Sequence, residues 1–119
     1  MPNDVDAQLQ MTAELVEVNL GYGDQVDRPR QIDHLAGFRS RKAADAAARD
    51  LAALGYRIDG IRRRILTVWL EFSHETAVDH DRAAAFTREV IGVLNEHGGD
   101  YDGWSGFLVT GSTEHAPEQ

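Results

Sequence analysis

The sequence reads QIDHLAGF over residues 31–38 and then SRKAADAAARDLAAL over residues 40–54, and these two runs decide the fold. In the first run every second side chain from Ile32 to Phe38 falls on one side, which is typical of a strand. In the second run Ser40 is a suitable N-cap, and alanine is the residue that best favours a helix. The sequence therefore predicts a strand followed by a helix. The stripe expected to be buried on this helix comprises Ala44, Ala47, Ala48, Leu51 and Leu54.

Two further strands are predicted after this helix, over residues 56–61 and 65–72. A turn over residues 62–64 gives the two strands matched lengths and is preferred, while Asp59-Gly60 offers an alternative two-residue turn. Both faces of the second of these strands are apolar. It is therefore expected near the centre of the sheet.

Two more helices and a last strand complete the pattern. A helix is predicted over residues 4–20, because apolar side chains recur there at steps of four and three. A second helix is predicted from Asp79, its N-cap, to about His97, and a strand over residues 101–110. The stripes expected to be buried on the two helices are Leu9, Ala13, Val16 and Leu20, and Phe86, Val90, Val93, Leu94 and His97.

This order of elements predicts an α+β fold, namely a ferredoxin-like βαββαβ sandwich with an additional N-terminal helix. We expect residues 1–23 to form that helix packed on the domain, residues 24–110 to form the ferredoxin-like domain, and residues 111–119 to form a flexible tail. Two helices should cover one sheet face and leave the other open, with Trp69 on it. The N-terminal helix should pack across that face or against its rim, and self-association through the open face is the alternative.

The composition limits the classes of function. The 119 residues include no cysteine, which excludes disulfides and thiolate chemistry. No apolar stretch approaches the roughly 18 residues that span a bilayer, so a soluble cytoplasmic protein is expected, with no membrane partner. The net charge of −8 disfavours direct binding of nucleic acid and favours a basic polypeptide as partner.

Two motifs carry a resemblance to a known family. The first is Gly23-Asp24 followed by Pro29-Arg30-Gln31-Ile32-Asp33-His34, and the second is His97-Gly98-Gly99-Asp100-Tyr101-Asp102-Gly103-Trp104. Together they resemble the regulator of ribonuclease activity B family, the ribonuclease E inhibitor domain, over roughly residues 15–109. The resemblance implies a ferredoxin-like fold, no catalysis, no cofactor, and contact with a ribonuclease E-type endonuclease. The sequence lacks the long acidic extension that some members carry.

The candidate protein-binding residues are Asp33, His34, Tyr101, Asp102 and Trp104. Tyr and Trp are frequent at the energetic centres of interfaces, but here both also suit a purely structural role as anchors of the last strand. Asp33 and His34 are adjacent on a strand and point to opposite faces, which argues against an acid–base pair. No catalytic residue is therefore predicted.

Two rival functions rest on other residues. Arg62-Arg63-Arg64, together with Trp69 on an open sheet, is compatible with an RNA-binding module. A second cluster, His74, Glu75, Asp79, His80 and Asp81, contains residue types that bind zinc or iron. Its spacing matches no helical His pair, so a metal-dependent enzyme is the less favoured alternative and no metal site is predicted.

Overall fold

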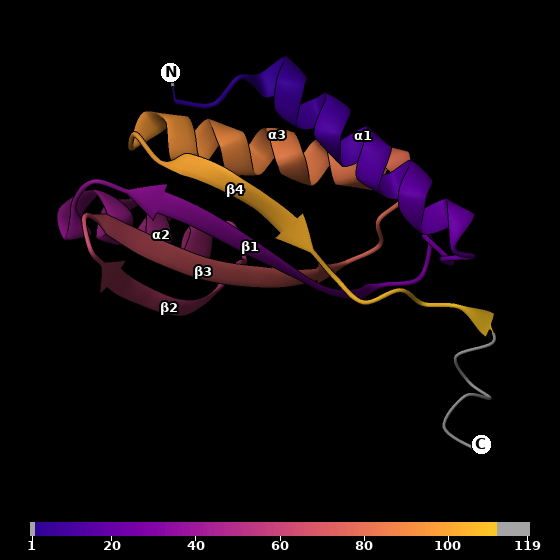
Figure 1. Cartoon of the computed structure of the whole chain (residues 1–119). Helices are drawn as coiled ribbons and strands as arrows, with labels where there is room; N and C mark the ends of the chain where they lie inside the picture. Colours follow the sequence, from indigo (N-terminus) through magenta and orange to yellow (C-terminus); the bar gives the residue numbers. More distant parts are fainter. Residues whose placement is uncertain (1, 112–119) are drawn as a thin grey trace.

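The computed structural model describes residues 2–111 and shows an α+β fold of three helices and one four-stranded sheet (Figure 1). The predicted order of elements is confirmed, including the additional N-terminal helix. The elements are α1 (Val5–Gly21), β1 (Arg30–Phe38), α2 (Arg41–Ala53), β2 (Arg57–Arg64), β3 (Thr67–Thr76), α3 (His80–Glu96) and β4 (Asp100–Ser105). The expected tail over residues 111–119 lies outside the described residues, apart from Gly111.

The sheet has the strand order β2-β3-β1-β4, and all neighbouring strands are antiparallel. This is the order of a ferredoxin-like βαββαβ fold, with β1 and β3 in the centre as expected. Both helix starts are capped as predicted, since the Ser40 side chain accepts from the Ala43 amide and the Asp79 side chain from the Arg82 amide. Helices α2 and α3 lie on one face of the sheet (Figure 1).

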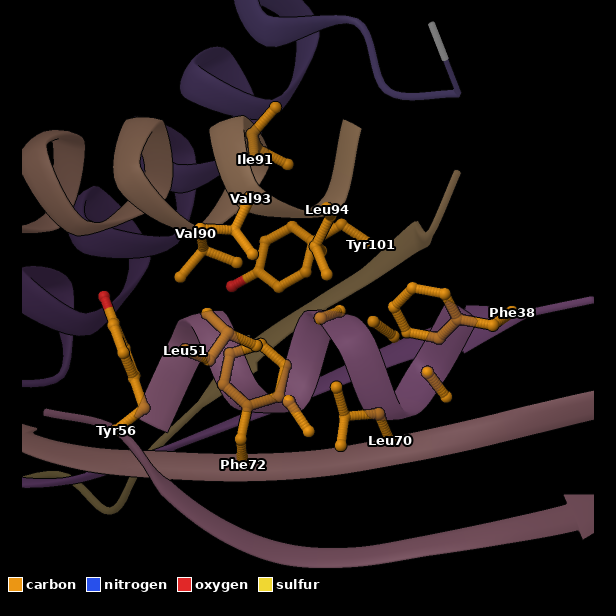
Figure 2. Packing of buried hydrophobic residues seen from close by; sticks show 14 of the residues in the cluster. Phe38, Leu51, Tyr56, Leu70, Phe72, Val90, Ile91, Val93, Leu94 and Tyr101 are labelled. Carbon is orange, nitrogen blue, oxygen red and sulfur yellow. The ribbon is translucent and has the colours of Figure 1, made fainter. Parts of the chain in front are cut away.

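The main core lies between this face and the two helices (Figure 2). Leu70 and Phe72 of β3 are fully buried against Leu51 of α2 and against Val90 and Leu94 of α3. Each such side chain contributes roughly 1.5–3 kcal/mol by leaving water. These contacts fix which face of every strand points inward, and they leave the alternate side chains on the open face.

The N-terminal helix extends the helical layer instead of crossing the open face. It packs along α3 above the β4 edge (Figure 1) and shares a smaller core with Ile32 and Phe86. Its predicted stripe is only partly correct, because Val16 is buried whereas Leu20 is 40% exposed. His80, the first residue of α3, bonds to Glu17, so Leu20 lies beyond the start of α3 and stays partly exposed.

The predicted turn between β2 and β3 is wrong. Strand β2 continues through the three arginines to Arg64, and the turn falls at Ile65-Leu66, with Ile65 at a φ of 58°. Asp59-Gly60 is the site of a β-bulge, since the pairing register with β3 shifts between Ile58 and Gly60. An edge strand tolerates a run of long charged residues because only one side of it is paired.

Three smaller predictions are also corrected. Leu54 is 50% exposed, because α2 ends at Ala53 and the next residue already points to solvent. His97 is only half-buried and bonds to Asp50. Strand β4 ends at Ser105, after which residues 106–110 follow a non-strand path beside β1.

Candidate functional site

The open face of the sheet is acidic at one end. Asp33 of β1, Asp59 of β2 and Asp102 of β4 line a shallow hollow of about 580 Å³ there, and we call these three residues the acidic end. Glu71 of β3 lies next to them. Because neighbouring strands bring together side chains of the same face, residues distant in sequence form one negatively charged surface.

The carboxylates of this face differ in their partners. Asp59 pairs with Arg57, and Glu71 accepts from Arg62 at 2.6 Å. The Asp33 carboxylate accepts a hydrogen bond from the side-chain amide of Gln31 at 2.8 Å. Neither Asp33 nor Asp102 has a basic partner among residues 2–111. These two carboxylates therefore remain available to a positively charged ligand.

His34 and Tyr101, which the sequence places with the candidate residues, lie on the other face and are buried. His34 Nδ1 and the Tyr101 hydroxyl are 2.7 Å apart, and the His34 ring stacks on Phe72 at 4.9 Å between centroids. Burial, followed by the nearby His74, lowers the pKa of His34 to about 3. His34 is therefore a neutral core residue that joins β1 to β4, and it is inaccessible to a partner.

Trp104 is half-buried on the same inner side as Tyr101, although it lies three positions further along the strand. Ala36 pairs with Tyr101 and His34 with Trp104, so Asp102 and Gly103 together oppose the single residue between. This β-bulge depends on Gly103, whose φ of 101° is unfavourable for other residues. The bulge turns both rings towards the helices and leaves the Asp102 side chain on the open face.

The Trp104 ring joins α1 to the rest of the molecule. Its Nε1 donates to Thr12 Oγ1 at 3.1 Å, and Thr12 is in turn 2.9 Å from Thr87 Oγ1 of α3. The ring also contacts Phe86 edge-on, at 5.3 Å between centroids. Trp104 therefore has a structural role, because its ring anchors both β4 and α1.

The first sequence motif contains an ion pair that sequence reasoning missed. Arg30 Nη1 donates to both Asp24 oxygens at 2.7 and 2.8 Å, and the Asp24 side chain is fully buried. Asp24 also accepts from the Val109 amide at 2.8 Å, while Arg30 donates to the Phe107 carbonyl at 3.2 Å. The pair therefore holds residues 106–110 against the start of β1.

The residues considered for a metal do not come together. His74 belongs to β3 and faces the interior, with its ring 4.9 Å from that of His34. Asp79 caps α3, and His80 bonds to Glu17. No group of three or more potential metal ligands occurs within residues 2–111.

In that part of the chain, no helix is long and apolar enough to cross a membrane.

Comparison with known proteins decides the family. The model of the family described as "Regulator of ribonuclease activity B" matches residues 9–105. The chain belongs to the regulator of ribonuclease activity B family. The match includes all four strands and both motifs, so the resemblance stated from the sequence is confirmed. A search of curated proteins finds no match.

In this member of the regulator of ribonuclease activity B family, the candidate residues divide into two groups. Asp33 and Asp102 are exposed on the open face, whereas His34 and Tyr101 are buried beneath them and Trp104 is half-buried at the α1 side. Because side chains alternate along a strand, Asp33 and His34 point to opposite faces of the sheet. No sequence signal indicated the Asp24–Arg30 pair, because its two residues are separated by an irregular connector.

Replacing Gly103 with alanine is expected to lower the free energy of unfolding by about 1–2 kcal/mol, because a Cβ is strained at a positive φ. The exposed Gly92 of α3 serves as the matched control, since a Cβ there meets nothing within 4 Å. Gly92→Ala is expected to stabilise the protein by about 0.5–1 kcal/mol. Urea denaturation measures both changes, and equal effects of the two substitutions would contradict the role assigned to the bulge.

Proposed function

We propose that this family member is a non-catalytic, cytoplasmic regulator that binds a ribonuclease E-type endonuclease by protein–protein contact. Its open sheet face would dock on an Arg- and Lys-rich segment of that enzyme. The observation that supports this most directly is a pair of exposed carboxylates, Asp33 and Asp102, that have no basic partner in the described part of the chain. The membership in a family of ribonuclease regulators supports the same reading.

Competition for positive charge is the mechanism we propose for the regulation. An endonuclease holds RNA through basic side chains that neutralise phosphates. A partner that occupies those side chains lowers the affinity of the enzyme for RNA without cleaving any bond itself. The net charge of −8 adds long-range attraction towards a basic segment, which raises the association rate at low salt.

The buried candidate residues support this surface from inside. The contact between His34 and Tyr101 holds β1 beside β4, and their outward neighbours in the sequence are Asp33 and Asp102. A fixed spacing between two carboxylates favours a partner with matching cations, because less conformational freedom is lost on binding. His34, Tyr101 and Trp104 are thus positioning residues in this proposal.

The double substitution Asp33→Asn and Asp102→Asn is expected to weaken binding to the basic segment roughly tenfold, since two ion pairs of the exposed type are lost. Isothermal titration calorimetry at low salt measures the dissociation constant. The control is Glu14→Gln with Glu96→Gln, which removes two exposed charges from α1 and α3 and should change binding less. If the wild-type protein does not bind the endonuclease at low salt, the proposal is overturned.

A further inference from the structure

The open face also has a basic end, at the turn between β2 and β3. We define it as residues 62–66 with Trp69, and these residues line a second hollow of about 720 Å³. Ile65 and Leu66 at the turn are 85% and 82% exposed. Arg62 and Arg64 pair in register with Trp69 and Thr67, so their side chains lie on the open face, whereas Arg63 pairs with the buried Val68 and lies on the helix side. Arg62 bonds to Glu71, and Arg64 has no acidic partner among residues 2–111. The basic end therefore presents two arginines, one of them free, and two exposed aliphatic side chains.

The two ends are parts of one continuous surface. Leu35, Glu71 and Asp102 line both hollows, so the acidic end and the basic end adjoin in the middle of the sheet. The Trp69 ring lies flat over Gly37 of the neighbouring strand, since a Cβ added to Gly37 would be 3.1 Å from that ring. No helix covers this surface (Figure 1). Within residues 2–111, it carries two carboxylates without basic partners at one end, and Arg64 with the Glu71-bonded Arg62 at the other.

We propose that this face binds a second copy of the chain, in a two-fold symmetric dimer in which each basic end lies on the partner's acidic end. A two-fold axis that lies parallel to this face, and perpendicular to the line joining its two ends, places each end on the opposite end of the partner. A face with opposite charges at its ends is then complementary to itself. In this dimer Arg62 and Arg64 approach Asp33 and Asp102 of the other copy, and Ile65 and Leu66 leave water in its hollow.

Other occupants fit only half of the face. An RNA strand could stack a base on Trp69 and contact the arginines, but its phosphates would meet Asp102 and Glu71, which line the same hollow. A basic peptide matches the acidic end and leaves Ile65 and Leu66 exposed. A second copy of the chain is the partner that offers both charges in the required arrangement.

The dimer has a consequence for regulation, which rests on the proposed function. It covers Asp33 and Asp102, so dimerisation and binding of the basic ribonuclease segment exclude each other. The dimer would then have to dissociate before the regulator could bind the ribonuclease. The dimer itself can be tested without any ribonuclease.

Charge exchange between two variants provides the test, with association measured by sedimentation velocity. One variant carries Arg62→Glu and Arg64→Glu, and the other carries Asp33→Arg and Asp102→Arg. Each variant alone places like charges together and is expected to be monomeric where the wild-type protein dimerises. Their equimolar mixture restores opposite charges at both contacts. We expect the mixture to form a heterodimer at least tenfold more tightly than either variant associates with itself.

The controls carry the same charge changes elsewhere. Arg49→Glu with Arg88→Glu, and Glu14→Arg with Glu96→Arg, lie on exposed helix positions and should leave the dimer intact. The variant with Arg62→Glu and Arg64→Glu keeps Asp33 and Asp102, so it should still bind the ribonuclease segment. This separates a failure of the dimer from a failure of the proposed function.

Three results would overturn the dimer. These are a wild-type protein that stays monomeric at high micromolar concentration, variants that dimerise as well alone as the wild type does, and a mixture that does not associate. Binding of oligouridylate by a monomeric wild-type protein, lost on replacing Arg62 and Arg64, would assign the basic end to RNA instead.

Discussion

Replacing Asp24 with alanine is expected to lower the free energy of unfolding by about 3–5 kcal/mol, the largest effect we expect from any single substitution in this protein. The change leaves the Arg30 guanidinium, whose side chain is only 7% exposed, without its counter-charge. It also removes the acceptor of the Val109 amide. Equilibrium denaturation in urea at pH 7 measures the loss.

Two comparisons show whether the cost arises from the unpaired buried charge. Asp45→Ala makes the same replacement in an exposed ion pair with Arg41 and should cost less than about 0.5 kcal/mol. The double variant Asp24→Ala with Arg30→Met removes both charges and should be more stable than Asp24→Ala alone. A loss below about 1 kcal/mol for Asp24→Ala would show that the pair contributes little, and a double variant less stable than the single would show that the cost does not arise from the unpaired charge.

Lowering the pH from 7 to 4 is expected to remove about 3 kcal/mol of stability through His34 alone. Burial, and then the neighbouring His74, lowers the pKa of His34 from 6.5 to about 3. Below pH 6.5 the unfolded chain therefore binds a proton that the folded protein does not bind until about pH 3. Stability falls across that window at roughly 1.4 kcal/mol per pH unit.

The His34→Gln variant tests this pH dependence, because glutamine keeps a polar group near Tyr101 and does not titrate. The variant should be less stable than the wild type at pH 7, but its stability should fall by about 3 kcal/mol less on going to pH 4. Parallel wild-type and His34→Gln profiles would show that the histidine is protonated in the folded state.

The order of elements could be predicted because each helix and strand has a periodic pattern of its own. Ser40 and Asp79 gave correct helix starts, and the apolar pattern of residues 65–72 correctly indicated a central strand. The β2–β3 turn could not be predicted, since Ile65-Leu66 lacks the glycine, asparagine or proline that favour turns. Its position depends on pairing of β2 with β3, which is not a local property.

The candidate surface could be predicted only in part, for a related reason. Strand alternation correctly separates Asp33 from His34, and it places Asp33 on the open face. The same rule applied to Tyr101 and Trp104 would put them on opposite faces, and only the bulge at Gly103 brings them together. The acidic end combines residues from three strands. That combination depends on the strand order, which a one-dimensional pattern does not contain.

The positions of the two tryptophans on opposite sides of the sheet make the protein suitable for fluorescence spectroscopy. Trp69 lies in the middle of the open face, whereas the Trp104 indole is bonded to α1. Each is the sole fluorophore of its kind once the other is replaced by phenylalanine, because the sequence contains only two. Emission from residue 69 then follows occupancy of the surface, and emission from residue 104 follows detachment of the first helix. Two events in one small domain can thus be recorded separately, without an attached dye.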